Sequence, residues 1–260
     1  MRNNMEEKPK YGWYVKNLII GFNIVGLIGL TSFICGFLID GIVQIILIIS
    51  GVAVVLVFLW PGIGMIMMHL LLLRKMPKID LMARMKALDE IDNPQILDAG
   101  CGTGRTAIRI AKALNNGGHL FGIDIYSKFA IPGNTLDTVQ NNARIEKVED
   151  KTTFQYGSAT DIPFEENRFD IVNASSVLHE VHKANGKNRA MQELYRVLRP
   201  GGYLYLSEWN RKSWQCIVFC GLCCYVFKKK EYWDKLLKEN NLKDITYENI
   251  TGFGIFTARK

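Results

Sequence analysis

Two long stretches of this 260-residue chain contain no charged side chain. Asp, Glu, Lys and Arg are all absent from residues 17–39 and again from residues 41–73, where His69 is the one basic side chain. Each stretch is longer than the roughly 20 apolar residues that a helix needs to cross a bilayer. This length favours two membrane-spanning helices over the buried core helices of a soluble domain.

The two predicted spans follow each other closely. We place the first near residues 18–39 and the second near residues 42–60, so that only Asp40 and Gly41 connect them and a tight helical hairpin is expected. The tip has no Lys or Arg, whereas such residues flank both outer ends: Arg2, Lys8, Lys10, Lys16, Arg74, Lys75 and Lys78. Because positive charge is retained on the cytoplasmic side, both flanks are predicted to be cytoplasmic, with Asp40 near the outer face.

The ends of these spans carry two further indications. The first apolar run is too long for a signal peptide, no small-residue cleavage site follows it, and a second span comes at once. Pro61, within residues 60–64, is predicted to break the second helix at the membrane surface. Residues 65–73 are then expected to lie along the membrane or to pack on the domain that follows.

Paired Cys-x-x-Cys motifs are also missing, which excludes a zinc ribbon. Four of the six cysteines are spaced so as to lie on neighbouring turns of one helix: Cys216, Cys220, Cys223 and Cys224. We interpret them as small buried apolar side chains. Binding of a soft metal or metalloid, and acylation near a membrane, remain alternatives.

The segment that holds these cysteines, residues 214–227, is apolar throughout but short for a span. Arg211 and Lys212 precede it, and three lysines follow it at 228–230. An apolar body between cationic flanks is typical of a segment on an anionic membrane surface, so residues 211–230 are predicted to face the membrane. A buried core helix is the alternative. The net charge of +7 also favours an anionic membrane surface as the partner, and no nucleic-acid-binding motif is present.

The most informative motif is Asp-x-Gly-x-Gly-x-Gly, which runs from Asp98 to Gly104. It predicts a buried strand that stops at a glycine loop, with a helix starting near Arg105. Glycine lets the backbone approach a ligand closely, and the helix points free N–H groups at that ligand. A second predicted strand ends at Asp124, whose carboxylate can accept hydrogen bonds from both hydroxyls of an adenosine ribose. Asp98 would repel a pyrophosphate and suits a cationic ligand.

Three later segments follow in a fixed order. They are residues 157–164, residues 169–174 as a strand, and residues 197–202 as the turn before a strand at 203–207. With the glycine motif, they resemble the class I S-adenosylmethionine-dependent methyltransferases, most closely the type 11 group, over about residues 80–260. The resemblance implies S-adenosylmethionine as cofactor. It also implies an α/β, Rossmann-like, seven-stranded methyltransferase fold, preceded here by two transmembrane helices.

The resemblance assigns cofactor roles to residues at the predicted strand ends. It implies that Asp124 holds the ribose and that Ser158 and Ala159 lie near adenine. Ser158 departs from the family, which often has Asp at that place. The whole implied cofactor site is Asp98, Gly100, Cys101, Gly102, Gly104, Asp124, Ile125, Ser158, Ala159 and Ser175.

Methyl transfer requires that donor and acceptor are aligned and water excluded, and an amine or hydroxyl acceptor also needs a base. His179 is the candidate base, because it follows the fourth strand where the family often has a histidine near the substrate. His179 and His182 are expected to share one face of a helical turn. Glu208 and Trp209 are candidates for recognising a cationic or polar head group. These histidines lack the H-E-x-x-H spacing, so no metal is predicted.

The remaining elements come from apolar periodicity and turn residues. Helices are predicted at residues 79–91, 105–114, 135–148, 189–198 and 232–239, and a closing β-hairpin at 244–250 and 253–258. The first of these helices either covers the cofactor or substrate site or only packs on the domain. The loop at 129–134 either lines the active site or is an inert insertion.

The predicted organisation has three parts: a cytoplasmic tail (1–16), a transmembrane hairpin with an interfacial segment (17–73), and a methyltransferase domain on the cytoplasmic side (74–260). The expected function is that of an integral membrane methyltransferase. Its partners would be the lipid bilayer and a hydrophobic, lipid-like or membrane-partitioned small molecule as acceptor. Two alternatives stay open. One is a methyltransferase for a soluble thiol or metalloid, and the other a non-catalytic S-adenosylmethionine-binding membrane protein.

Overall fold

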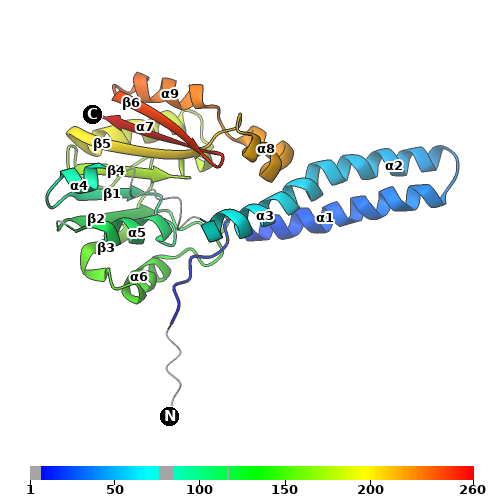
Figure 1. Ribbon diagram of the computed structural model, residues 1–260, viewed down its shortest axis with the longest axis horizontal. Coiled ribbons are helices and arrows are strands. Elements are labelled where there is room, and N and C mark those ends of the chain that lie inside the picture. Colours follow the sequence, from blue (N-terminus) through cyan, green and yellow to red (C-terminus); the bar gives the residue numbers. More distant parts are fainter. Residues whose placement is uncertain (1–6, 76–84, 116) are drawn as a thin grey trace, which may run out of the picture.

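A long helical hairpin projects from an α/β domain in the computed structural model (Figure 1), which describes residues 7–75, 85–115 and 117–260. The domain contains one seven-stranded sheet in the order β3-β2-β1-β4-β5-β7-β6. The first five strands pair in parallel, and β7 runs antiparallel to both of its neighbours. The strands are β1 (Gln95–Ala99), β2 (His119–Asp124), β3 (Thr152–Tyr156), β4 (Phe169–Ser175), β5 (Leu198–Trp209), β6 (Lys243–Ile250) and β7 (Phe253–Arg259).

Helices cover both faces of this sheet, as a central parallel sheet requires. They are α4 (Ala87–Glu90), α5 (Arg105–Ala113), α6 (Leu136–Ile145), α7 (Gly186–Val197) and α9 (Lys230–Glu239). Successive residues of β1 divide between the two cores. Ile96 packs with α5 and α6 on one face, and Leu97 with α7 and α9 on the other. The predicted seven-stranded α/β fold and closing hairpin are confirmed. Of the helix predicted at 79–91, residues 79–84 lie outside the described part of the chain.

The hairpin consists of two long apolar helices. The first is α1 (Lys16–Cys35), extended by a 3₁₀ turn, η1 (Gly36–Leu38). The second joins α2 (Ile42–Val54), a π-helical turn η2 (Val55–Leu59) and α3 (Trp60–Lys75). By length and composition, Lys16–Leu38 and Ile42–Leu71 are each able to cross a bilayer, which is weak support for membrane spans. The connection is as tight as predicted to within one residue: residues 39–41 lie between η1 and α2.

The break predicted at residues 60–64 is wrong, because the second helix continues through Pro61. The π-helical turn directly precedes this proline, and the Trp60 N–H reaches back five residues to the Val55 carbonyl. A π turn widens the helix locally, and proline inside a helix removes one i→i−4 hydrogen bond. We infer that the irregular turn lets the chain accommodate Pro61 without ending the helix.

The two helices approach each other at glycines. A Cβ atom on Gly51 of the second helix would lie only 2.6 Å from the Phe33 backbone nitrogen, and one on Gly26 would lie 2.5 Å from the Leu59 Cβ. Small residues at such contacts let helix backbones pack closely without help from a hydrophobic effect.

We predict that Gly51→Val lowers the thermal stability of the hairpin by the roughly 1–3 kcal/mol typical of overpacking. The matched control is Gly21→Val on α1, where a Cβ would meet no atom within 4 Å. Both variants place the same β-branched residue in a helix, so only the contact differs. Thermal unfolding in lipid nanodiscs measures the difference, and equal melting temperatures for the two variants would contradict the observed packing.

The apolar segment after β5 forms a short helix, α8 (Trp214–Cys220), and 3₁₀ turns, η7 (Gly221–Val226), so the expected continuous helix is wrong. Gly221 lies between them at a φ of 52°, which ends α8. Cys216, Cys220 and Cys224 are buried, in agreement with their interpretation as small apolar side chains. Among the described residues, no three His, Cys, Asp or Glu side chains are grouped to hold a metal ion.

Candidate active site

The glycine loop lies where β1 ends and α5 begins. Gly100 and Gly104 have φ values of 81° and 86°, a conformation that few residues other than glycine adopt. The N–H groups of Gly100 and Cys101 donate to the Ile123 carbonyl at the end of β2, at 2.7 and 3.0 Å. A Cβ on Gly102 would meet only Ile131 Cδ1, at 3.5 Å, so the backbone there is open to a ligand.

Asp98, the acid of the motif, is buried at the end of β1 with one oxygen unused. Its Oδ1 accepts a hydrogen bond from Asn173 Nδ2 of β4 at 2.6 Å, whereas Oδ2 has no hydrogen-bond partner among the described residues. Burial raises the pKa of Asp98 to about 7, the Asn173 hydrogen bond lowers it, and the charge of Asp124 raises it further. A buried carboxylate with a free oxygen is suited to accept a cationic donor.

Asp124, at the end of β2, is occupied by donors of the protein. Its Oδ2 accepts from the Gly102 N–H at 2.9 Å, and its Oδ1 accepts from the Tyr126 N–H and from Asn134 Nδ2. Tyr126 has a φ of 51°, an uncommon conformation that turns the chain back toward this carboxylate. Asp124 therefore holds the glycine loop in place, and any ribose contact would share these oxygens. Ile125 beside it is exposed.

The other predicted cofactor residues lie at the ends of the neighbouring strands. The Gly157 N–H donates to the Asp124 carbonyl at 3.1 Å, which brings the loop after β3 beside the end of β2. In that loop Ala159 is buried, and Ser158 Oγ accepts from the Thr160 N–H at 3.2 Å. Ser175 ends β4, beside β1. The strand ends thus gather the predicted residues along one edge of the sheet.

An N-terminal segment that the sequence did not reveal crosses this edge. We call residues 9–15 the strap. The Tyr11 carbonyl accepts from Thr103 Oγ1 at 3.0 Å, and the Val15 N–H donates to the Ala130 carbonyl at 2.6 Å. The loop at 129–134, for which two roles were open, therefore contacts the strap. The strap thus lies over part of this edge, and residues 79–84 of the helix for which covering and packing roles were both open lie outside the described residues.

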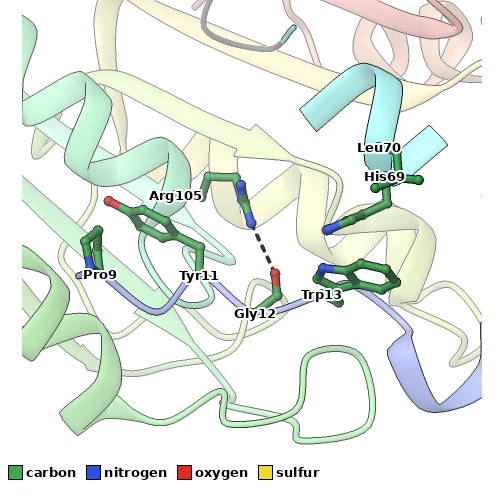
Figure 2. A pocket seen from close by; sticks show the side chains of 7 residues that line it. All are labelled: Pro9, Tyr11, Gly12, Trp13, His69, Leu70 and Arg105. Carbon is green, nitrogen blue, oxygen red and sulfur yellow. Dashed lines mark hydrogen bonds between the residues drawn. The ribbon is translucent and has the colours of Figure 1, made fainter. Parts of the chain in front are cut away.

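A pocket of about 450 Å³ lies between the strap, α3 and the start of α5 (Figure 2). Arg105 points at the strap and donates to the Gly12 carbonyl at 3.2 Å. The rings of Trp13 and His69 lie 3.8 Å apart, which joins the strap to α3. The lining consists of Pro9, Tyr11, Gly12, Trp13, His69, Leu70 and Arg105.

A second cluster surrounds His179 in the turn η6 (Leu178–Glu180), after β4. Glu208 of β5 accepts from the backbone N–H groups of Val177 and Leu178 through Oε1, and its Oε2 lies 2.8 Å from His179 Nδ1. Both Glu208 oxygens are thus used, and Trp209 is buried. The prediction that this pair recognises a head group is wrong for the structure described, because Glu208 instead fixes the His179 turn.

Only one of the two predicted histidines lies in this cluster. His179 is 5% exposed, whereas His182 is exposed to solvent, because the turn ends at Glu180 and Val181 is extended. The prediction that they share a face is therefore wrong. Burial lowers the pKa of His179, but the charge and hydrogen bond of Glu208 and the charge of Glu180 outweigh burial, so this pKa is raised.

Comparison with known proteins now identifies the fold. Residues 91–248, more than half of the chain, match a family described as "Methyltransferase domain". A solved structure, a SAM-dependent methyltransferase from Aquifex aeolicus, superimposes with a TM-score of 0.54 at 17% identity, covering 70% of this chain and 90% of that one. At this identity the likeness concerns the fold alone.

Two curated relatives are similar in sequence. The demethylmenaquinone methyltransferase of Lactiplantibacillus plantarum is 34% identical over 45% of this chain and 45% of its own length. The ubiquinone/menaquinone biosynthesis C-methyltransferase UbiE of Agrobacterium fabrum is 34% identical over 49% of this chain and 47% of its own length. The chain thus spans about half the length of the curated relatives that it matches.

Fold and motif together define the class of S-adenosylmethionine-dependent methyltransferases, for which S-adenosylmethionine is the methyl donor. The chain belongs to the methyltransferase-domain family matched at residues 91–248.

We predict that Asp98→Asn changes how stability depends on pH in the cofactor-free protein. The folded state raises the pKa of Asp98 from 3.8 to about 7, so ionisation favours unfolding as pH rises between these values. Between about pH 4 and pH 7, the wild type should lose roughly 1.4 kcal/mol per pH unit relative to the variant. Chemical unfolding at several pH values tests this, and parallel curves would contradict it.

Proposed function

We propose that this chain is a membrane-anchored methyltransferase that transfers a methyl group from S-adenosylmethionine to a lipid-like or membrane-partitioned small molecule. The observation that carries the proposal is the position of the hairpin. It begins directly after the strap that crosses the carboxyl edge of the sheet, where ligands bind in open α/β folds (Figure 1). An acceptor held in the membrane would therefore be close to this edge.

The residues at the edge fit the cofactor. The unpartnered Asp98 Oδ2 is suited to the ammonium group of the methionine part, and the open backbone at Gly102 to close approach. We assign the cofactor site to Asp98, Gly100, Cys101, Gly102, Gly104, Asp124, Ile125, Ser158, Ala159 and Ser175. When bound, S-adenosylmethionine supplies an electrophilic methyl group whose bonding electron pair stays on sulfur.

His179 is the proposed base of the reaction. Methylation of an O–H, N–H or acidic C–H group breaks the bond to hydrogen and leaves one proton per turnover. Glu208 holds Nδ1 of His179, so Nε2 is the nitrogen that accepts this proton, and the negative charge of Glu208 stabilises the resulting imidazolium. Burial of this pair excludes water from the reacting groups.

The geometry of the second helix supports a bilayer boundary near Trp60. The helix Ile42–Leu71 has 30 residues and would be about 45 Å long, whereas the hydrocarbon core is about 30 Å thick. The end of this helix nearer the α/β domain, α3, would then extend beyond the hydrocarbon core. There it contacts α8: Trp60 Nε1 donates to the Val218 carbonyl at 3.1 Å, and Gly64 lies against the Phe219 backbone. We therefore propose spans within 17–73 and a cytoplasmic domain at 74–260.

The outer surface of α8 and η7 is suited to lie in the membrane interface. Trp214 is 67% exposed, and Ile217, Leu222 and Tyr225 are also exposed beside the buried cysteines. Lys228–Lys230 follow this surface in the sequence. An exposed apolar surface beside cationic residues is favourable on an anionic leaflet.

We predict that Trp214 contacts lipid. Brominated lipids in nanodiscs quench tryptophan fluorescence at short range, so Trp214→Phe should remove part of the quenching seen in the wild type. The other four tryptophans, Trp13, Trp60, Trp209 and Trp233, are present in both proteins, so the difference between the two reports on Trp214. An unchanged quenched fraction in Trp214→Phe would show that α8 faces water.

The acceptor class rests on this placement and on similarity. Two relatives carry names that refer to menaquinone or ubiquinone synthesis. Quinone-like ring systems with apolar tails would partition into the bilayer beside the proposed site. A metalloid acceptor held by the cysteines is not favoured, because Cys216, Cys220 and Cys224 are buried.

The test uses the 260-residue chain in nanodiscs, methyl-labelled S-adenosylmethionine and a total membrane lipid extract. We expect label in the organic phase with wild type and a loss of at least ten-fold with His179→Gln, which retains binding of the cofactor. Asp98→Asn should instead weaken cofactor binding measured by calorimetry. Cofactor binding without label in the organic phase would contradict a lipid-like acceptor and favour a soluble acceptor or a binding protein.

A further inference from the structure

The strap reaches the His179 cluster through one side chain, Tyr14. Its hydroxyl lies 2.9 Å from His179 Nε2 and is also hydrogen-bonded to Glu180 Oε1. His179 Nδ1 is held by Glu208, so both ring nitrogens have a partner. Glu208, His179, Tyr14 and Glu180 thus form one continuous chain of hydrogen bonds.

Counting protons fixes the direction of each bond. A tyrosine hydroxyl has one proton and an ionised carboxylate has none, so Tyr14 donates to Glu180. The bond between Tyr14 and His179 then requires a proton on Nε2, and the bond to Glu208 requires one on Nδ1. A doubly protonated His179 would satisfy both bonds at once, and the charges of Glu208 and Glu180 favour that form by raising the pKa of His179.

We propose that Tyr14 is a positioning residue for the base His179. The Tyr14 hydroxyl holds the proton on His179 Nε2 and passes it through Glu180 to solvent. The proposal rests on the role of His179 given above. The acceptor and the Tyr14 hydroxyl would contact Nε2 one after the other. Nε2 must carry no proton and no hydrogen bond to Tyr14 when it takes the proton of the acceptor. The Tyr14 hydroxyl then hydrogen-bonds to Nε2–H again, and the proton leaves toward Glu180.

Exposure supports this route. His179 and Glu208 are 5% and 1% exposed, so neither reaches water, whereas the Glu180 side chain is 37% exposed. In the transfer, Nε2–H gives its proton to the Tyr14 oxygen while the Tyr14 O–H proton moves to Glu180, so the phenol stays neutral throughout. Burial, and next the charge of Glu180, raise the pKa of Tyr14, which excludes phenolate as a resting form.

Other charged groups near the cluster are few in the described part of the chain. Lys187 of α7 donates to the carbonyls of His179 and Val181, and its charge opposes the imidazolium. Cys220 of α8 faces Tyr14, Lys228 lies near Lys187, and the neutral ring of Phe227 packs against His179. Burial and the charge of Lys187 thus lower the pKa of His179, whereas Glu208 and Glu180 raise it.

The test measures His179 directly by nitrogen-15 NMR of the imidazole in nanodiscs, assigned with His179→Gln. We expect Tyr14→Phe to lower the pKa of His179 by about one pH unit, the size of one hydrogen bond to a charged group. Tyr11→Phe is the matched control. It removes a strap hydroxyl that donates to Glu146 at 3.2 Å, away from His179, and should leave this pKa unchanged.

Glu180→Gln should lower the pKa of His179 even without Tyr14, because His179 Nε2 also lies 3.6 Å from Glu180 Oε1. Should Tyr14→Phe misfold, wild-type spectra still test the proposal: a proton on Nε2 that is hydrogen-bonded to Tyr14 should give a slowly exchanging Nε2–H resonance, and its absence would overturn the proposal. An unchanged or raised pKa in Tyr14→Phe would overturn the proposal, because the ion pair between His179 Nε2 and Glu180 Oε1, 3.6 Å apart, would then hold the proton without Tyr14. This readout needs no turnover, so it is separate from failure of the proposed function. Where methylation is detected, the acid limb of kcat should shift to lower pH, whereas a merely structural effect would lower kcat equally at every pH.

Discussion

The buried side chain of Asn142 makes the contact that sets how the helical hairpin is placed relative to the glycine loop. It accepts the Lys10 N–H at 2.7 Å and donates to the carbonyls of Lys10 and Thr103 at 3.1 and 2.9 Å. One amide on α6 thus joins the strap to the glycine loop. Because α1 begins at Lys16, a strap fixed in this way also fixes where the hairpin leaves the domain. The start of the hairpin and the glycine loop are thus joined through the strap and Asn142.

Local sequence rules predicted the parts of the structure that local interactions determine. The glycine motif predicted a strand, a loop and a helix, and β1, the open backbone at Gly102 and α5 follow in that order. Asp124 was predicted as a ligand residue at a strand end, and it lies there. The pairing of β1 with β4 was not predicted from the sequence, because pairing of parallel strands depends on contacts distant in sequence.

The contacts that were not predicted, and the predictions that were wrong, also have physical causes. Tyr14 and His179 are 165 residues apart, and no periodicity or spacing connects them. Glu208 was expected to bind a head group because it ends a strand at the ligand edge, but a carboxylate of this burial needs donors, and the His179 turn supplies them. Pro61 was expected to end its helix, since the rule for proline considers a regular α-helix, whereas a π turn precedes it here.

The two buried carboxylates of the site differ in how their charge is compensated. Glu208 accepts from two backbone N–H groups, and its Oε2 lies 2.8 Å from His179 Nδ1, so its charge is compensated within the protein. Asp98 has one amide donor and one oxygen without a partner, so its charge is costly until a cation arrives. Binding a cationic methionine group would remove this cost. The unpaired charge of Asp98 lowers the stability of the free protein, and relief of that destabilisation would add to the affinity for the cofactor. The same loop contacts the strap through Thr103, so cofactor binding and the position of Tyr14 would be energetically linked.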